Sequence, residues 1–200
     1  MSTVIIDLSV SLDGYIAGPD DGPDLPLGRG GPALFTWMGA GPETVGSDDR
    51  LRPPEASRPV VEEWHAGAGA MISGRRTFDI ANGWADGHPV DAPIFVVTHD
   101  PPTEGRWSPQ VTFVPEGVAA ALAQAREVAG DGWVSASGAS VAQQLLQLGA
   151  VDEIQLSVAP VLLGGGVRLL DHIGPAPLTL EQVRVIASDG VTHLRYRVVR

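Results

Sequence analysis

Two short segments of the sequence combine small residues with hydrogen-bond donors in a way that suits phosphate groups. Residues 73–77 (SGRRT) place two guanidinium groups and a hydroxyl directly after a short apolar run. Residues 135–140 (SASGAS) are small enough to let a ligand approach the backbone closely. Guanidinium groups bind phosphate oxygens, and free amides at the start of a helix attract anions. Together the segments predict a site for a phosphorylated ligand, although each alone is also typical of helix capping or of a solvated arginine pair.

Two residue types are missing, and their absence excludes whole classes of chemistry. All thirteen basic residues are arginine, so lysine Schiff bases and a Walker-type phosphate lysine are impossible. Cysteine is absent as well, which excludes disulfides, thiol nucleophiles and thiolate zinc sites. The five histidines show no metal-ligand spacing, and no Gly-x-Ser-x-Gly elbow occurs. We therefore predict no metal site and no serine-hydrolase chemistry.

The charge and hydropathy of the chain limit its partners. A net charge of -11 argues against nucleic acid, because binding to nucleic acid draws much of its affinity from cations. No apolar stretch approaches the roughly 20 residues of a membrane span. The N-terminus lacks a basic region, and Asp7 interrupts its apolar run, so it does not resemble a secretion signal. These features predict a cytoplasmic protein that binds neither nucleic acid nor membranes.

The surrounding elements alternate between strand and helix patterns and predict a single α/β domain over residues 1–200. A mostly parallel sheet with helices on both faces and an antiparallel hairpin at the C-terminus follows from this order. The expected strands are residues 4–10, 70–73, 94–98, 111–114, 133–136, 152–158, 178–186 and 191–198, and the expected longer helices are residues 59–65, 116–129 and 139–148. Both phosphate-competent segments therefore lie where a strand ends and a helix begins.

A segment rich in glycine and proline, residues 18–59, shows no sustained period and predicts a long loop. A short helix around residues 35–38 interrupts it. Long loops inside domains are often lids or binding loops, and a surface insertion without a role is an equal alternative.

The motifs, taken in order, resemble the dihydrofolate reductase-like family. Residues 11–18 (SLDGYIAG) are similar to its loop after the first strand, and residues 73–78 (SGRRTF) to its cofactor motif. Residues 134–146 resemble its glycine-rich strand-to-helix segment. Residues 151–154 (VDEI) and 159–166 (APVLLGGG) resemble the branch of the riboflavin-biosynthesis reductase, the C-terminal domain of a bacterial bifunctional deaminase-reductase. The resemblance covers nearly the whole chain outside residues 18–59.

This resemblance implies a three-layer fold with a central mixed, mostly parallel sheet of about eight strands, and NADPH as hydride donor. Carried over by position, the implied cofactor-binding residues are Ser9, Ile16 and Ala17 beside the nicotinamide, Gly74, Arg75, Arg76 and Thr77 at the adenosine phosphates, Thr98 and His99 near the adenine ribose, and Ser137, Gly138, Ala139, Ser140 and Val141 at the pyrophosphate. Many relatives have consecutive glycines where this chain has Ser137, Gly138 and Ala139, which predicts a less close approach and a lower affinity.

The catalytic group is less defined by the resemblance. Folate reductases carry a buried carboxylate after the first loop, and Glu43, Asp48 and Asp49 fall in that stretch. Asp13, near the expected cleft, and Ser157, on a strand that faces the substrate, are the candidate catalytic residues. Trp37 is a candidate for stacking on a planar substrate. The proton donor stays open.

The resemblance implies an NADPH-dependent reductase of a small planar heterocycle, which could be pterin-like, pyrimidine-like or a xenobiotic. One alternative is a member of the fold that binds a nucleotide or small ligand without catalysis. Another is 5-amino-6-(5-phosphoribosylamino)uracil reductase of riboflavin biosynthesis. Relatives are often dimers, so a homodimer through the C-terminal strands is also expected.

Overall fold

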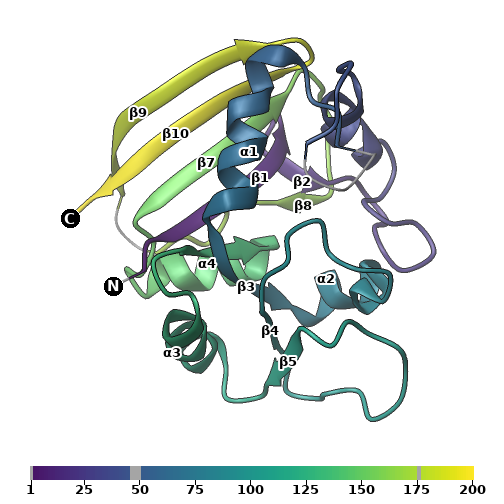
Figure 1. Ribbon diagram of the computed structural model, residues 1–200, viewed down its shortest axis with the longest axis vertical. Helices are drawn as coiled ribbons and strands as arrows, with labels where there is room; N and C mark the ends of the chain where they lie inside the picture. The colour runs from purple at the N-terminus through teal and green to yellow at the C-terminus, as the bar shows by residue number, and fades with distance from the viewer. Residues whose placement is uncertain (1, 46–50, 175–176) are drawn as a thin grey trace.

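An eight-stranded sheet runs through the middle of the protein (Figure 1). Its strand order is β5-β4-β3-β6-β1-β7-β10-β9. The computed structural model describes residues 2–45, 51–174 and 177–200. The strands are β1 (Val4–Ser11), β3 (Ala68–Gly74), β4 (Ile94–Val97), β5 (Val111–Val114), β6 (Trp133–Ser137), β7 (Glu153–Ala159), β9 (Thr179–Ser188) and β10 (Val191–Val199).

The strand directions confirm the predicted mixed sheet. β1 is parallel to both of its neighbours, β6 and β7, and β3, β4 and β5 continue the parallel part. β10 is antiparallel to β7 and β9, which form the C-terminal edge. The first residues of β1, Val4, Ile5 and Ile6, are fully buried, as expected for a central strand that is covered on both faces.

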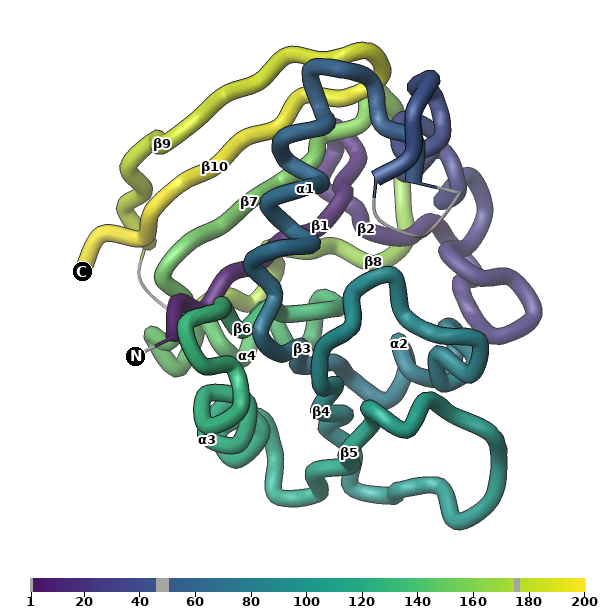
Figure 2. Tube along the Cα trace, in the orientation of Figure 1, coloured from purple at the N-terminus to yellow at the C-terminus, as the bar shows by residue number. Residues whose placement is uncertain are grey.

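Helices cover both faces of the sheet, which gives the expected three layers (Figures 1 and 2). On one face α3 (Val118–Val128) and α4 (Ala139–Gln147) pack their buried alanines, leucines and valines against alternate residues of the inner strands. On the other face lie α1 (Arg58–Gly67) and α2 (Arg75–Ile80). Each fully buried aliphatic side chain contributes roughly 1.5–3 kcal/mol, so this core holds the strand ends in fixed positions.

The long loop segment, which the structure describes over residues 18–45 and 51–59, packs against the body of the protein. It contains the 3-10 helices η1 (Gly31–Gly39) and η2 (Glu55–Ser57), and η1 includes the short helix expected around residues 35–38. Trp37 of η1 is 2% exposed and packs with Val61 of α1 and Val191 of β10. A further 3-10 helix, η3 (Asn82–Trp84), follows α2.

A second, two-stranded sheet was not predicted from the sequence. It pairs β2 (Tyr15–Ala17), directly after the first turn, with β8 (Val167–Arg168), directly after the glycine triplet. Both strands are too short to show a period. In the described part of the chain, no helix has the length and apolar content of a membrane span.

Candidate active site

A pocket of about 330 Å³ opens at the start of α4, and we call it the α4 pocket. It gathers all of the predicted cofactor residues except Ser9, Thr98 and His99. Those in its lining are Ile16, Ala17, Gly74, Arg75, Arg76, Thr77, Ser137, Gly138, Ala139, Ser140 and Val141. Because β3 and β6 are parallel neighbours, their carboxyl ends bring the two phosphate-competent segments together.

The turn between β6 and α4 requires glycine. Gly138 has φ 94°, and a Cβ there would lie 2.6 Å from Thr77 Oγ1. The first helical hydrogen bond of α4 runs from Ala142 N to Gly138 O, so the three preceding amides have no helical acceptor. No side chain caps this helix start. Free amides, the helix dipole and the absent Cβ together form a cradle that fits a phosphate group.

Both predicted phosphate-binding arginines have carboxylate partners within the protein. Arg76 Nε donates to Asp21 at 2.9 Å, and this hydrogen bond raises the pKa of Arg76. Arg75 Nε donates to Asp79 at 2.9 Å, and its guanidinium also donates to the carbonyl oxygen of Asp100. Asp21 itself lines the α4 pocket, with a side chain 7% exposed. A phosphate would therefore join a preformed ion pair rather than two free cations.

The other three predicted cofactor residues lie outside the α4 pocket. Ser9 lines the neighbouring pocket described next. Thr98 is buried, and its hydroxyl donates to the backbone carbonyl of Asp100 at 3.2 Å. His99 is exposed beside it. These two residues thus shape the turn after β4 and do not line the α4 pocket.

A second pocket, of about 350 Å³, lies between α1, η1 and the sheet, and we call it the central pocket. Four residues of its lining were selected from the sequence. Ser9 and Ser137 were expected at the cofactor, Trp37 was a candidate for stacking on the substrate, and Ser157 was a candidate catalytic residue. Ser137 also lines the α4 pocket, so the two pockets meet at this residue. A ligand anchored in the α4 pocket can therefore reach a second molecule in the central pocket.

Asp7 of β1 is an acid in the central pocket that sequence reasoning did not select. Burial raises the pKa of Asp7 from 3.8 to about 7, against the opposing effect of Arg195. The available signal was the single charged residue inside an otherwise uncharged strand. Asp7 is part of the lining, so it faces the cleft. A group with a pKa near 7 can exist both as donor and as acceptor under ordinary conditions.

Two residues that line this pocket each carry a buried polar atom with no hydrogen-bond partner within the described protein. These atoms are Ser9 Oγ and Trp37 Nε1, in residues that are 5% and 2% exposed. Ser157 differs, because its Oγ lies 2.9 Å from His193 Nδ1. Buried polar groups without partners are costly and uncommon, so these two atoms suit hydrogen bonds to a ligand.

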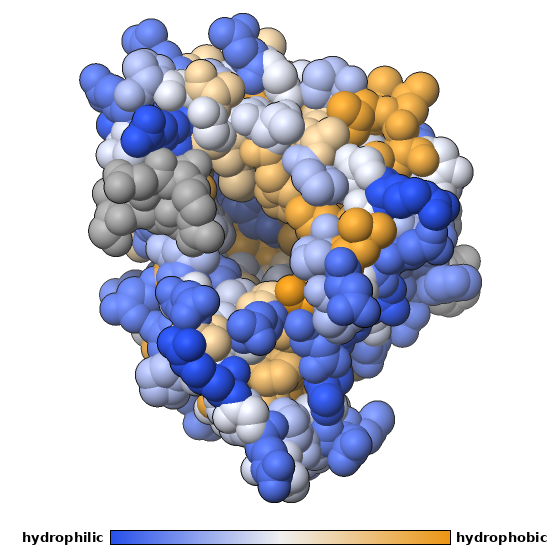
Figure 3. Space-filling view, turned by 90° about the vertical axis from the view of Figure 1, so that its right-hand side faces the viewer, coloured by the Kyte–Doolittle hydropathy of each residue, from blue (hydrophilic) through white to orange (hydrophobic). Residues whose placement is uncertain are grey.

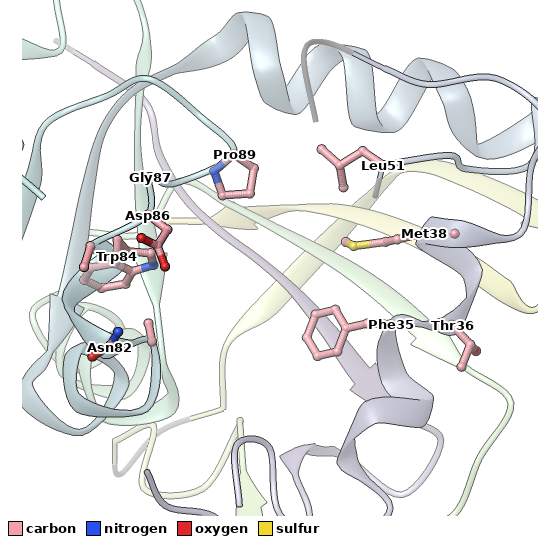
Figure 4. A pocket seen from close by; sticks show the side chains of 12 residues that line it. Phe35, Thr36, Met38, Leu51, Asn82, Trp84, Asp86, Gly87 and Pro89 are labelled. Atoms are coloured by element: carbon pink, nitrogen blue, oxygen red, sulfur yellow. The ribbon is translucent and has the colours of Figure 1, made fainter. Parts of the chain in front are cut away.

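A third and larger pocket, about 600 Å³, adjoins the central pocket, and we call it the outer pocket. Figure 4 shows Phe35 and Met38 of η1 facing Trp84 and Pro89 across it. The linings of the two pockets share Phe35, Met38, Leu51 and Pro89. They form one cleft, and the surface of Figure 3 is hollowed with hydrophobic residues around the opening.

Asp13, predicted as a catalytic candidate, lies in neither the α4 pocket nor the central pocket. Its carboxylate accepts hydrogen bonds from Ser11 Oγ at 2.6 Å and from the backbone amides of Leu163 and Gly164 at 3.1 and 2.7 Å. The hydrogen bond from Ser11, with those from the two amides, lowers the pKa of Asp13 to about 2. This geometry connects the turn after β1 to the glycine triplet and fits a structural role.

The acids considered in the long loop do not supply a buried carboxylate within the described chain. Glu43 is largely exposed and pairs with Arg58 at 3.3 Å. Asp48 and Asp49 lie outside the described residues. Among the residues that the structure describes, no group of three or more His, Asp or Glu side chains is placed to hold a metal ion.

Comparisons with known proteins agree with this fold. A curated relative, the uncharacterized protein YwjB of Bacillus subtilis, is 25% identical over 170 residues, 84% of this chain and 83% of YwjB. A structure from Shewanella sp. PV-4, named only for a role in riboflavin biosynthesis that has been assigned by inference, is 22% identical with a TM-score of 0.67 and full coverage of both chains.

Two further structures extend the likeness in fold. One is a Thermotoga maritima diaminohydroxyphosphoribosylaminopyrimidine deaminase/5-amino-6-(5-phosphoribosylamino)uracil reductase, 17% identical with a TM-score of 0.62. That match covers 99% of this chain and 57% of the Thermotoga protein. The other is dihydrofolate reductase from Enterococcus faecalis in complex with NADP(H), 14% identical with a TM-score of 0.57, covering 99% and 97%.

The sequence itself matches one family model over almost its full length. That model describes the RibD C-terminal domain and matches residues 2–194. The strand order, the α4 pocket and the central pocket thus occur in a reductase-type fold, and the chain belongs to the RibD C-terminal domain family.

Proposed function

We propose that this protein is an NADPH-dependent reductase of a small, planar, unphosphorylated heterocycle. The observation that carries the proposal is the meeting of the α4 pocket and the central pocket at Ser137. One pocket suits the phosphates of a dinucleotide, and the other suits a flat polar molecule. Hydride transfer needs this arrangement, because the reacting carbons must touch while the phosphates are held at a distance.

The residues of the α4 pocket fit the cofactor. The Gly138 turn and the uncapped start of α4 would hold the pyrophosphate, and Arg75 and Arg76 would contact the remaining phosphate oxygens. Ile16 and Ala17 of β2 line the same pocket and would contact the nicotinamide. When bound, NADPH supplies a hydride; the protein's own contribution is position, exclusion of water and hydrogen bonding.

The central pocket fits a heterocycle with both donor and acceptor groups. Asp7 can accept hydrogen bonds from ring or amino N–H groups, and its raised pKa also lets it donate. Ser9 Oγ and Trp37 Nε1 offer two further unpaired groups. Phe35 and Trp64 line the same pocket and suit the faces of a planar ring.

The pocket charges favour a substrate without a phosphate. Among the described residues that line the central and outer pockets there is no arginine, and the chain contains no lysine. The charged residues in these linings are Asp7 and Asp86. Arg106, outside the linings, is paired with Asp86 at 3.1 Å. Because a phosphate needs cationic partners, we propose a different substrate from the phosphoribosyl compound named for the Thermotoga protein.

Cofactor binding is tested first, by thermal unfolding and by fluorescence titration with NADPH and NADH. A micromolar site should stabilise the protein by roughly 4 kcal/mol at a thousandfold excess over Kd. An unchanged melting temperature at millimolar NADPH would rule out the proposed function.

Catalysis is tested by NADPH oxidation with 7,8-dihydropterin, with 5,6-diaminouracil, and with 5-amino-6-(ribosylamino)uracil with and without its 5′-phosphate. Menadione, which is not a heterocycle, is included for comparison. We expect turnover of an unphosphorylated ring compound and no preference for the phosphorylated form of the matched pair. NADPH binding without oxidation of any compound would instead support the alternative of a non-catalytic binding protein. A strong preference for the phosphoribosyl compound would contradict the substrate class.

A further inference from the structure

Four side chains form a continuous hydrogen-bonded chain through the protein interior. Ser157 Oγ lies 2.9 Å from His193 Nδ1, and His193 Nε2 lies 2.8 Å from Ser57 Oγ. Ser57 Oγ donates to Ser188 Oγ or accepts from it, again at 2.8 Å. His193 is 1% exposed and Ser57 is fully buried. The proposed reductase function by itself gives no role to His193, Ser57 or Ser188.

The two ends of this chain lie in different environments. Ser157 lines the central pocket, where a substrate would lie. Ser188, at the end of β9, lines a surface pocket of about 490 Å³ together with Glu55 and Asp189. The turn between β9 and β10 lies beside the start of α1 in Figures 1 and 2, at the rim of the sheet. The chain therefore links the substrate pocket to solvent.

The imidazole in the middle of the chain is neutral. Burial lowers the pKa of His193 to about 4, and Arg184 of β9 acts in the same direction. Other charged groups on this face include Asp7 of β1 and Arg195 of β10, which pairs with Glu63 of α1 and Glu153 of β7. A neutral imidazole has one N–H donor and one bare acceptor nitrogen. Every hydrogen bond of the chain must therefore point the same way, either toward the pocket or away from it.

We propose that Ser188, Ser57, His193 and Ser157 form a relay that delivers a solvent proton to the substrate during reduction. This inference rests on the proposed reductase function and names the proton donor that the function requires. Ser157 is the catalytic residue of the relay, because it lines the pocket. His193, Ser57 and Ser188 act through it and are positioning residues.

The proton step balances without any further reactant. Reduction adds a hydride to a substrate carbon and leaves an electron pair on the adjoining heteroatom, which takes the Ser157 hydroxyl proton. Ser157 takes the proton of His193 Nδ1, Nε2 takes that of Ser57, Ser57 takes that of Ser188, and Ser188 is reprotonated by water. The imidazole ends in its other tautomer. After product release, water in the open pocket returns a proton to Nδ1 through Ser157 while Nε2 gives its proton back along the chain.

The competing donor is Asp7, which lines the same pocket. The two routes make different predictions, because Asp7 donates without help from Ser57 or Ser188. Removal of a hydroxyl at Ser57 or Ser188, neither of which lines the central pocket or the α4 pocket, should slow only the relay.

The first experiment needs no substrate. Nitrogen-15 NMR of the full chain with labelled histidine should show one protonated and one bare nitrogen for His193 at about pH 7. Ser57→Ala should shift the resonance of Nε2, and Ser157→Ala that of Nδ1. An imidazolium at this pH, or no response of either nitrogen, would overturn the relay.

The second experiment measures single-turnover NADPH oxidation in H₂O and D₂O with a ring compound that the wild type reduces. We expect Ser57→Ala and Ser188→Ala to slow the reaction roughly tenfold or more and to alter the solvent isotope effect, with NADPH affinity unchanged. Ser188→Thr keeps the hydroxyl at a partly exposed strand position, so this variant should react at the wild-type rate, unlike Ser188→Ala. Ser2→Ala, which removes a buried hydroxyl at the opposite end of β1, is the matched control.

The outcomes separate the two proposals. Wild-type rates in folded Ser57→Ala and Ser188→Ala variants would overturn the relay and leave the reductase function intact. If the wild type binds NADPH but oxidises it with no compound, the proposed function fails. If both histidine nitrogens still responded in the NMR experiment, the four hydrogen-bonded side chains would be a structural network. The relay proposal would then fail together with the reductase function.

Discussion

A carboxylic acid with a pKa near 7 gives the central pocket a charge that depends on pH in the ordinary range. The folded-state pKa of Asp7 lies above its unfolded value of 3.8. Below about pH 4 Asp7 is protonated in both the folded and the unfolded state, so its titration does not lower the free energy of unfolding. As the pH rises from about 4 through 7, the unfolded state loses this proton first, and the free energy of unfolding falls. This cost is the physical price of holding a titratable group beside the substrate.

We predict that Asp7→Asn removes this loss. Relative to the wild type, the variant should gain free energy of unfolding as the pH rises from about 4 to 8, by at most about 4 kcal/mol. Urea unfolding of both proteins across this range measures the difference. Parallel stability curves for the two proteins would contradict the raised pKa.

The negative charge of Asp21 should repel a phosphate in the α4 pocket. Its carboxylate lines the α4 pocket and is hydrogen-bonded to Arg76. We predict that Asp21→Asn binds NADPH roughly fivefold more tightly, because a negative charge is removed and Arg76 loses its charged partner. Fluorescence titration measures Kd. Asp20→Asn is the matched control, because Asp20 pairs with Arg29 on the exposed loop and does not line the pocket. Equal gains in both variants would indicate only a change in net charge.

At the level of secondary-structure elements, the turn between β6 and α4 packs closely against the junction of β3 and α2. Gly138 has positive φ, and it faces Thr77 at the other strand-to-helix junction. We predict that Gly138→Ala lowers NADPH affinity at least tenfold and destabilises the protein by roughly 1–3 kcal/mol. The added methyl group fills the cradle as well as straining the backbone.

Gly149→Ala provides the control for this prediction. Gly149 ends α4 with φ 62°, and a Cβ there would meet no atom within 4 Å. The substitution should cost roughly 1–2 kcal/mol of stability and leave NADPH affinity unchanged. Calorimetry and titration of both variants separate strain from lost contact. Equal losses of affinity would show that the cradle is not the phosphate site.

The elements themselves were largely predictable from the sequence, because their signals are local. β-branched runs and glycine punctuation gave the strands, and α4 was expected at residues 139–148 against the observed Ala139–Gln147. The pairing of β2 with β8 was missed, since strands of three and two residues carry no period. The packing of Trp37 against His193, with ring centroids 5.0 Å apart, depends on residues far apart in sequence.

The candidate site was predictable where a motif marks it and not where burial creates it. The two junctions that line the α4 pocket were found from small residues and arginines next to strands. The importance of Asp7 arises from desolvation in the folded chain, and that of His193 from two serines in distant segments. No spacing rule encodes such contacts. Asp13 shows the converse, because a polar residue close to an expected cleft points to backbone amides instead.

At the scale of the whole molecule, one sheet face near the C-terminal edge carries exposed apolar residues. Val183 and Val185 of β9 are 43% and 49% exposed, and Val185 lies opposite Leu194 of β10. Leu194 lines a pocket with Leu12 and Leu170, which are also exposed. Large exposed apolar patches are typical of interaction surfaces.

We predict that this face forms a homodimer. Light scattering after size exclusion should give twice the chain mass of 20.9 kDa, and Val185→Lys should lower it toward that of one chain. Thr112→Lys, at an exposed position of the edge strand β5, should leave the dimer intact. A single-chain mass for the wild type at micromolar concentration would contradict the dimer.

The hydrogen bonds of Asp13 have a consequence for the timing of turnover. They tie the turn before β2 to the loop before β8, and residues of both short strands, Ile16, Ala17 and Val167, wall the α4 pocket. A dinucleotide bound in the α4 pocket would therefore contact this two-stranded sheet. Asp13, which does not line the pocket, would then hold this wall in place and so affect how long the dinucleotide stays bound.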